Sequence, residues 1–345
     1  MLTLDRIERL CRLDLDERTL RIAVLAEIRV AVPCDAYVWL LTDPETCVGS
    51  APLAEAPSLA DLPTLIRLKY LTAANRWTSL QAGAAATLVE ATAGDRRLSR
   101  VWDELLSGYG IDDVASTVFR DHHGCWGFLD LWRRRRPFTS AETGFLGQVA
   151  AAVTPALRRS LASTFALRPP DFDGREPVVL VLSEGLEPLT QTPQADAYLR
   201  ALLPTSAGRP PVPAGVLNVA AQLLAQEEGV DAHPPWARVH LGDGVWVTLR
   251  AARMVSTAGQ TGPTLAVSIE PTPPAERTAL YARVLGLSDR ETELLHHLVG
   301  GTDTRELARR LFLSENTVQD HLKSIFAKTG AGNRRVLVAR ATGAA

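Results

Sequence analysis

Residues 287–341 constrain this chain more than any other stretch, because the spacing of their apolar and helix-capping residues predicts a bundle of four short helices. Ser288 with Glu291, and Asp303 with Glu306, have the spacing of a capping box, in which two side chains satisfy free backbone N–H groups at a helix start. The second of these helices is short, and a tight turn connects it to the third. Two helices joined in this way form a helix-turn-helix unit, which binds DNA when its second helix presents a polar face.

The helix after this turn begins at Ser314 and has two distinct faces. Its apolar residues recur at helical spacing and are expected to be buried: Val318, Leu322, Ile325 and Phe326. Long polar side chains gather on the opposite face, where residues three and four positions apart are neighbours: Gln319, Asp320 and Lys323. The sequence therefore predicts that these polar side chains read base edges in the major groove of double-stranded DNA.

The same segment resembles the LuxR/FixJ-type DNA-binding domain of bacterial transcription regulators, an all-α four-helix domain that we place at residues 282–345. The positions that carry the resemblance are in register throughout: Ser288, Arg290, Glu291, Gly301, Glu306, Leu307, Ala308, Leu311, Ser314, Thr317, Val318, His321, Leu322 and Lys328. The resemblance implies that further residues bind DNA, several of them by positioning its backbone: Arg305, Arg309, Ser314, Thr317, His321 and Lys328. It also implies that the last helix forms a homodimer contact: Asn333, Val336 and Arg340.

The predicted base-reading face departs from the family pattern at two positions. Lys or Arg is usual at position 319, and an uncharged or small residue is usual at position 320, where this chain has Gln and Asp. Glutamine favours adenine and an acidic side chain favours cytosine, so we expect an altered sequence preference.

Positive charge is concentrated in the same segment. Residues 283–345 hold ten Arg or Lys and seven Asp or Glu, a balance of +3, whereas the whole chain carries −2 at pH 7. The local excess argues against the alternative of a protein-interaction bundle. This excess of positive charge is small for a domain that binds the phosphate backbone of DNA. It therefore also favours a dimer, in which two copies double the number of phosphate contacts.

Residues 1–165 predict a separate α+β domain. Apolar residues at helical spacing indicate two helices within residues 3–30, and a β-rich run at 36–42 leads through a turn to a second strand. Further helices are expected at residues 58–74 and 96–106.

The clearest part of this half is a hairpin followed by a long helix. Strands are expected at residues 113–120 and 125–132, and Thr139 with Glu142 has the capping-box spacing at the helix start. The glycine hairpin and two following runs resemble the closing segment of a GAF domain: Gly127-Phe128-Leu129 and Arg136-Pro137-Phe138-Thr139. GAF domains are sensory modules with one antiparallel sheet flanked by helices, so the resemblance implies a sensory role for residues 1–165.

Histidines and cysteines in this half have two interpretations. His122, His123 and Cys125 could hold a metal, but they lack a nearby fourth ligand and hairpin tips are ordinarily polar, so no metal site is predicted. The four cysteines are widely spaced, which predicts buried reduced thiols rather than a disulfide framework: Cys11, Cys34, Cys47 and Cys125.

Basic and aromatic residues here also have two interpretations. The arginine run at residues 133–136 could grip an anion, yet the end of a strand is a normal place for solvated charge, which we expect. Four aromatic residues could line a ligand cavity, but a place in the core is expected: Trp77, Trp102, Tyr109 and Trp126.

Residues 172–273 predict a second α+β domain, after a proline-containing linker at residues 168–171. The expected elements are strands at 178–182 and 186–189, helices at 193–203 and 216–226, and strands with the sequences ARVHL, VWVTLRAARM and TLAVSIE. This order resembles a PAS-type sensory domain. The cofactor is unknown, because neither an NxC flavin-attachment motif nor an axial-histidine signature is present, and His240 is expected to be structural.

Proline-rich residues 271–274 stiffen the next linker, and a helix expected at residues 276–285 leads into the C-terminal domain. A conformational signal from the sensory half would have to pass through this segment.

Together these expectations describe a multidomain α+β transcription regulator whose sensory half modulates DNA binding. No enzyme is predicted, because the GxSxG, GxxxxGK[ST], HExxH and strand-linked GxGxxG patterns do not occur. The alternative is an enzyme or ligand-binding protein with an appended DNA-binding or interaction module.

The expected partners are double-stranded DNA and a second copy of the chain, with a small-molecule effector and RNA polymerase as further candidates. The first residues carry acidic side chains without an apolar signal region, and the sequence has no long uncharged apolar run. A cytoplasmic location without membrane contact is therefore expected.

Overall fold

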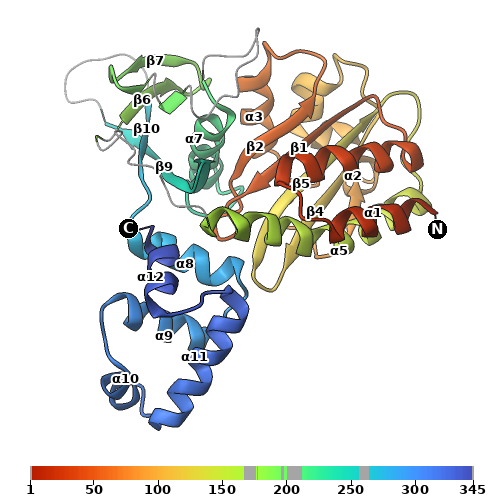
Figure 1. Cartoon of the computed structure of the whole chain (residues 1–345). Coiled ribbons are helices and arrows are strands. Elements are labelled where there is room, and N and C mark those ends of the chain that lie inside the picture. The colour runs from red at the N-terminus through yellow and green to blue at the C-terminus, as the bar shows by residue number, and fades with distance from the viewer. Residues whose placement is uncertain are drawn as a thin grey trace. The chain divides into compact units, whose positions relative to one another are not determined.

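The computed structural model describes residues 2–166, 176, 178–195, 198–199, 212–255 and 264–343 (Figure 1). The chain divides into two compact units. The first comprises Met1–Leu157, Gly174–Val239 and Val247–Glu270, and the second comprises Arg158–Asp173, His240–Trp246 and Pro271–Ala345. The first unit contains two sheets, and the second contains the C-terminal helices.

The first sheet has five strands in the order β2-β1-β5-β4-β3. These strands are β1 (Ala36–Thr42), β2 (Gly49–Glu55), β3 (Ala85–Thr87), β4 (Asp113–Asp121) and β5 (Gly124–Arg133). All four strand pairs are antiparallel, and the central strand β5 places Leu129 opposite both Trp39 and Thr117. The helices around this sheet are α1 (Leu2–Arg12), α2 (Glu17–Ala31), α3 (Leu62–Tyr70), α4 (Leu88–Ala91) and α5 (Ser140–Ser163).

Several elements lie where the sequence predicted them. The two N-terminal helices, the first strand pair and the β4–β5 hairpin are all present at the expected residues. Thr139 and Glu142 form the expected capping box, because Glu142 Oε2 accepts a bond from Thr139 N at 2.8 Å and Thr139 Oγ1 accepts one from Glu142 N at 3.3 Å. Local capping chemistry therefore identified the start of α5 correctly.

Two predicted helices differ from those observed. α3 begins at Leu62 rather than at residue 58, because Pro63 occupies its first turn, where the missing N–H of proline costs nothing. The expected helix at 96–106 is instead a 3₁₀ turn at Arg96–Leu98 and a π-helical turn at Trp102–Leu106. In the π turn, Ser107 N donates to Trp102 O at 2.9 Å, five residues back, which widens the helix.

The expectation of solvated charge at residues 133–136 is wrong for Arg133. Its side chain is buried, and its guanidinium lies 2.8 Å from Glu142 Oε1 and 2.9 Å from the carbonyl oxygen of Pro33. A buried cation requires such partners, so Arg133 joins the end of β5 to the start of α5. The three arginines that follow are exposed.

The second sheet has five strands in the order β7-β6-β10-β9-β8, so the two sheets share one connectivity. Its elements are β6 (Val178–Ser183), β7 (Pro188–Gln191), α7 (Ala214–Glu227), β8 (Trp236–Gly242), β9 (Val245–Met254) and β10 (Thr264–Pro271). The three C-terminal strands and α7 match the prediction, whereas the linker at 168–171 and most of the helix at 193–203 lie outside the described residues. α7 is buried from Ala214 to Ala225, because it packs against α3 and β2.

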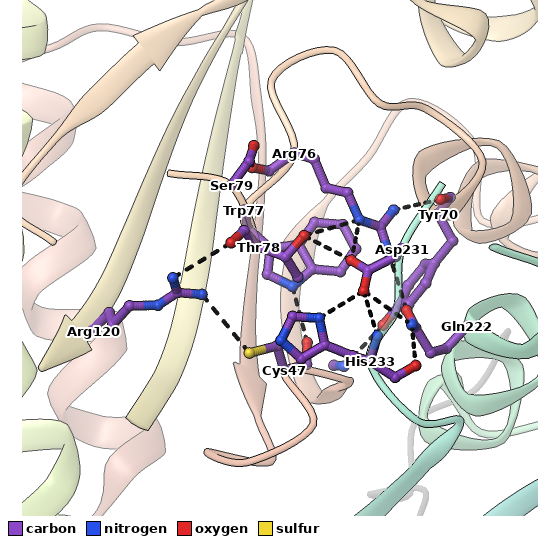
Figure 2. Close-up of polar contacts among 11 residues, drawn as sticks. Cys47, Tyr70, Arg76, Trp77, Thr78, Ser79, Arg120, Gln222, Asp231 and His233 are labelled. Atoms are coloured by element: carbon purple, nitrogen blue, oxygen red, sulfur yellow. Dashed lines mark hydrogen bonds and ion pairs between the residues drawn. The ribbon is translucent and has the colours of Figure 1, made fainter. Parts of the chain in front are cut away.

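Buried polar contacts connect α7 and β8 to the first sheet. Arg238 Nε lies 2.7 Å from Asp43 Oδ2, and both side chains are almost fully buried. Figure 2 shows a second group, in which Arg76 Nε lies 2.6 Å from Asp231 Oδ2 and Arg76 Nη2 donates to Gln222 at 3.1 Å. Removing one partner of a buried pair leaves an uncompensated charge, so each of these contacts is costly to break.

The second unit contains α8 (Pro274–Val284), α9 (Asp289–Val299), α10 (Thr304–Arg310), α11 (Glu315–Thr329) and α12 (Arg334–Thr342). α8, predicted at 276–285, packs against the short 3₁₀ turn after α5 and against the β8–β9 turn. Phe165 stacks on Trp246 with ring centroids 5.2 Å apart and meets Tyr281 edge-on at 5.4 Å. Arg277 Nη1 donates to the carbonyl oxygen of Gly244 at 3.0 Å. α8 is therefore anchored to the 3₁₀ turn after α5 and to the β8–β9 turn.

Candidate nucleic-acid interface

The first two helices of the luxR-like segment, α9 and α10, begin directly after the capping residues Ser288 and Asp303. Ser288 and Glu291 form the predicted capping box, with Glu291 Oε2 accepting from Ser288 N at 2.7 Å. Asp303 caps α10 by accepting from Glu306 N at 2.9 Å. The return half of the second box is not observed, because the Glu306 carboxylate binds Arg309 and Arg310 on its own helix instead.

α11 has the two faces that the sequence predicted. Val318, Leu322 and Ile325 are buried, and Phe326 is half-buried. On the other side Gln319 and Asp320 are exposed, as is Lys323, whose ammonium lies 3.0 Å from Asp320 Oδ1. An ion pair between side chains that are 77% and 73% exposed is weak, so both groups remain available to a partner.

The N-terminus of α11 is ordered by two hydroxyl groups. Ser314 Oγ accepts from Thr317 N at 3.1 Å, and the two hydroxyl oxygens lie 2.8 Å apart. Both residues are exposed. Hydroxyls and backbone amides at an exposed helix N-terminus form a favourable site for a phosphate oxygen.

The turn between α10 and α11 contains an unusual aromatic residue. Phe312 is 95% exposed and adopts a φ of 54°, a left-handed conformation that bulky residues rarely take. Its amide donates to Arg309 O at 3.4 Å, and the next residue, Leu313, donates to Ala308 O at 2.9 Å. These bonds close α10 and redirect the chain into α11.

Glu291 is the centre of a polar network that sequence reasoning missed. Its buried carboxylate accepts bonds from Lys328 Nζ at 2.6 Å and from Ser324 Oγ at 2.6 Å, in addition to Ser288 N. Burial opposes ionisation of Glu291, but these hydrogen bonds outweigh it and lower its pKa to about 2. The ionised carboxylate therefore fixes α11 against α9.

Lys328, predicted to contact DNA, also makes contacts within the domain, and its side chain is 38% exposed. Its ammonium also donates to the carbonyl oxygen of Gly286 at 3.2 Å. Other basic residues of the domain have similar tasks: Arg290 donates to the Leu311 carbonyl, and Arg334 Nη2 donates to the Thr302 carbonyl at 2.7 Å. The capping-box pattern located Glu291, but nothing in the local sequence indicated its partners from α11.

The two arginines of α10 that were predicted to bind DNA project into solvent. Arg305 is 87% exposed and lies 3.7 Å from Glu315 Oε1, and Arg309 is 74% exposed and pairs with Glu306. His321 is half-buried on α11. Arg305 and Arg309 therefore keep exposed charge on α10, the helix that precedes the turn.

The predicted dimer residues also make contacts within the domain. Asn333 Oδ1 caps α12 by accepting from Val336 N at 3.0 Å, and Val336 is half-buried. Arg340 Nη1 donates to the carbonyl oxygens of Thr329 and Gly330 at 3.3 and 3.4 Å. α12 is therefore held to the C-terminal end of α11.

A cavity of ≈ 70 Å³ lies in the first unit, beside α3, α7 and the first sheet. Its walls are predominantly apolar and include Val38, Leu65, Val101, Trp132 and Ala214. Lys69 and Asp130 also line it, but their charges lie 2.7 Å apart and compensate each other. The four aromatic residues considered from the sequence are not among its lining residues. Trp77 and Trp126 are buried in the core as expected, and Trp102 and Tyr109 pack against it.

The histidines and Cys125 of the β4–β5 hairpin diverge. Cys125 is buried, whereas His122 is exposed, and the centroid of its ring lies 3.7 Å from that of His123 with the two rings tilted by 43°. Within the residues that the structure describes, no group of three or more His, Cys, Asp or Glu residues could hold a metal ion.

None of the helices that the structure describes is both long and apolar enough to cross a membrane.

Residues 285–341 match the family model described as bacterial regulatory proteins, luxR family. The CsgBAC operon transcriptional regulatory protein of Escherichia coli is 48% identical over 48 residues, which are 14% of this chain and 22% of that protein. The probable transcriptional regulatory protein SgaR of Hyphomicrobium methylovorum is 43% identical over 53 residues, 15% of this chain and 25% of that protein. This chain thus covers only about a quarter or less of the length of these relatives.

A crystal structure of Escherichia coli SdiA aligns over 99% of this chain and 97% of its own length, at 14% identity and a TM-score of 0.35. A score of this size does not establish a shared overall fold. The match over residues 285–341 establishes the C-terminal domain as a luxR-type helix-turn-helix domain.

Proposed function

We propose, from the luxR-type helix-turn-helix domain at residues 285–341, that this chain is a DNA-binding transcription regulator and not an enzyme. The observation that carries the proposal is the exposed polar face of α11, opposite a buried apolar stripe. Gln319, Asp320 and Lys323 on that face have the length and hydrogen-bonding groups to read base edges. The short turn before α11 leaves this face free to enter a major groove.

The residues around this face would position the DNA backbone. Thr317 and Ser314 offer hydroxyls at the N-terminus of α11, and Arg305 and Arg309 offer exposed charge from α10. His321 is placed at the edge of the same helix. Lys328 would act mainly by holding α11 in place through Glu291, because its ammonium is already hydrogen-bonded.

A homodimer would supply the second reading helix. The domain carries one such helix and a small excess of positive charge, so two copies would double both the base and phosphate contacts. We assign the contact to α12 around Asn333, Val336 and Arg340. Of these, Val336 offers apolar surface, whereas Asn333 and Arg340 also hold α12 in shape.

The remainder of the chain would be its sensory half, with a GAF-like domain at residues 1–165 and a PAS-like domain at 172–273. Support comes from the two five-stranded sheets and from the cavity beside α3 and α7. Because the cavity is apolar and its charges are compensated, its effector would be small, neutral and largely apolar. α7 would respond when an effector occupies the cavity, since Ala214 and Asn218 of this helix form part of the cavity wall.

α8 would carry the signal to the DNA-binding domain. It follows β10 after a short proline-containing segment, and it is anchored to Phe165 through Tyr281 and to the Gly244 carbonyl through Arg277. RNA polymerase would be a further partner at a promoter, and the cytoplasm would be the site of action.

Retention of genomic DNA tests the proposal. The purified full chain is mixed with sheared genomic fragments at moderate salt, and the retained fragments are sequenced. A shared twofold-related motif is expected, and a variant carrying Gln319→Ala and Lys323→Ala should lose the enrichment. Equal retention of all fragments by both proteins would reject sequence-specific regulation.

A further inference from the structure

Phe312 is the most exposed of the large apolar side chains that the structure describes, at 95%. It lies in the turn between α10 and α11, two residues before Ser314, whose hydroxyl caps α11. Single exposed apolar side chains are common on protein surfaces, so exposure by itself assigns no role to the ring. The backbone of the same residue supplies a second observation.

The turn holds Phe312 in a conformation for which phenylalanine is poorly suited. Its φ is 54°, in the region where the Cβ of an L-residue crowds the following carbonyl oxygen. After α8, α9, α11 and α12 the chain also has a left-handed residue, with φ between 61° and 83°, and each of these is a glycine: Gly286, Gly301, Gly330 and Gly343. Strained residues of this kind concentrate at functional sites, because stability alone favours glycine or asparagine there.

The side chains around this turn are exposed and suited to DNA. Arg305 and Arg309 of α10 are 87% and 74% exposed, and Ser314 and Thr317 are exposed at the start of α11. Figure 1 shows α10 and α11 meeting at the end of the C-terminal helices that lies away from α12. In a helix-turn-helix unit the first helix crosses the DNA backbone and the N-terminal residues of the second contact base edges. The turn between them therefore lies at the rim of the major groove.

We propose that the ring of Phe312 packs on the C5-methyl group of a thymine in the major groove and adds this base to those that the domain reads. The proposal rests on the proposed DNA-binding function, because the turn meets a duplex only when α11 enters the groove. Phenylalanine has no hydrogen bond to offer a phosphate, whereas the thymine methyl is the apolar group that a base pair presents in this groove. The ring is in solvent in the free protein, so it gains apolar contact on binding.

This assignment predicts opposite changes in stability and in DNA affinity when the ring is removed. A left-handed phenylalanine is unfavourable in the free protein, so a residue that tolerates the conformation should leave the fold equally or more stable. Burial of one methyl-sized group corresponds to about a fourfold change in a binding constant, so the same replacement should weaken binding at least that much. A ring that served only the fold would change both properties in the same direction.

Replacement of the ring in the full chain tests the prediction. The probe is the duplex that the native chain selects most strongly from randomised DNA. Phe312→Asn should bind it at least about fourfold more weakly, while hydrogen exchange of α10 and α11 peptides stays the same or slows. Phe312→Tyr keeps an aromatic ring and should retain native affinity. Leu98→Asn is the matched control, because it removes a side chain that is 68% exposed in the first unit, and it should leave affinity unchanged.

Removal of the methyl group from the DNA identifies the partner of the ring. Deoxyuridine replaces each thymine of the selected duplex in turn, which removes the methyl group and keeps the base pair. At one thymine of each half-site, this replacement should weaken the native chain about fourfold and leave Phe312→Asn unaffected. If every replacement affects the two proteins equally, the assignment to a thymine methyl is wrong.

The remaining outcomes separate this proposal from its alternatives. Native DNA affinity of Phe312→Asn with reduced expression from a reporter would overturn it and place the ring on the transcription machinery. Weaker binding together with faster exchange of α10 and α11 would overturn it in favour of a structural role. If the native chain selects no sequence, the proposed function fails and this proposal fails with it. If a sequence is selected and Phe312→Asn binds it equally well, only this proposal is rejected.

Discussion

Lys328 Nζ lies 2.6 Å from Oε2 of Glu291, and this contact joins α11 to α9. Because Glu291 also closes the capping box of α9, one buried carboxylate sets both the start of the first helix and the position of the proposed reading helix. The contact predicts that DNA affinity depends on a residue that does not face DNA.

Glu291→Gln should therefore destabilise the C-terminal domain. The amide can no longer hold the Lys328 charge, so we expect a loss of about 1.5 to 3 kcal/mol, the usual range for a hydrogen bond to a charged group. Hydrogen exchange of α9 and α11 peptides measures the loss. Glu293→Gln is the control on the same helix, because Glu293 forms an exposed pair with Arg290 and should change stability by less than about 1 kcal/mol. Equal protection in both variants would contradict the role of Glu291.

The same carboxylate predicts a pH dependence. Its folded pKa of about 2 is below the ordinary value of 4.5, so its contribution is fully present above pH 4.5 and is lost as pH falls toward 2. The difference in exchange protection between the native chain and Glu291→Gln, corrected for intrinsic exchange, should shrink over this window. A difference that stays constant from pH 6 to pH 3 would show that ionisation of Glu291 is not the cause.

The sequence predicted this domain well because its information is local. Ser288, Asp303 and Ser314 each cap the helix that follows them, and the spacing of Val318, Leu322 and Ile325 identified the buried face of α11. The roles of Lys328 and Arg334 could not be predicted in this way. Their partners lie far away in sequence, and charged residues on a helix give the same pattern whether they meet solvent, DNA or a buried carboxylate.

The first unit shows the same limit. Strand and turn patterns located both sheets, but the cavity depends on how α7 packs against α3 and β2, which no local pattern specifies. Arg133 was expected in solvent because it lies at the end of a strand, yet it is buried and binds Glu142 and the Pro33 carbonyl. Whether such a side chain is buried depends on partners that lie far away in the sequence, and composition does not reveal those partners.

The cavity predicts selective binding of a neutral molecule. Hexan-1-ol and hexanoate have the same length, but burial of the carboxylate would leave a charge without a partner, so hexan-1-ol should bind at least about tenfold more tightly. Trp132 lines the cavity, so tryptophan fluorescence of the full chain follows the titration. Ala56→Phe should block binding from the cavity wall, whereas Ala73→Phe, at an exposed site outside the lining, should not. Equal affinity for both molecules would reject the site.

Dimeric binding predicts a strong salt dependence. Two copies that neutralise roughly 6 to 8 phosphates should give a slope of about −5 to −7 for the logarithm of affinity against the logarithm of salt concentration. Footprinting should show two half-sites on one side of the duplex. One unpaired half-site with 1:1 stoichiometry would contradict the dimer.

The segment before α8 predicts how the two halves communicate. Replacing residues 271–274 with a Gly-Ser sequence should uncouple regulation from the sensory half, because a flexible tether cannot transmit a rotation. DNA affinity without a signal should stay unchanged, which serves as the internal control. Reporter expression in cells measures regulation, and a full response by this variant would place the coupling elsewhere.

The most direct measurement of the central claim is selection of binding sites from randomised DNA by the full chain and three variants on α11. Gln319→Ala and Lys323→Ala should each cost about 1 to 3 kcal/mol on the best site and relax the preference at one or two base positions. Thr317→Ala should weaken all sites alike, because a phosphate contact carries no sequence information. The account is contradicted if the Gln319 and Lys323 variants lose affinity evenly across all sequences while Thr317→Ala changes the preferred bases.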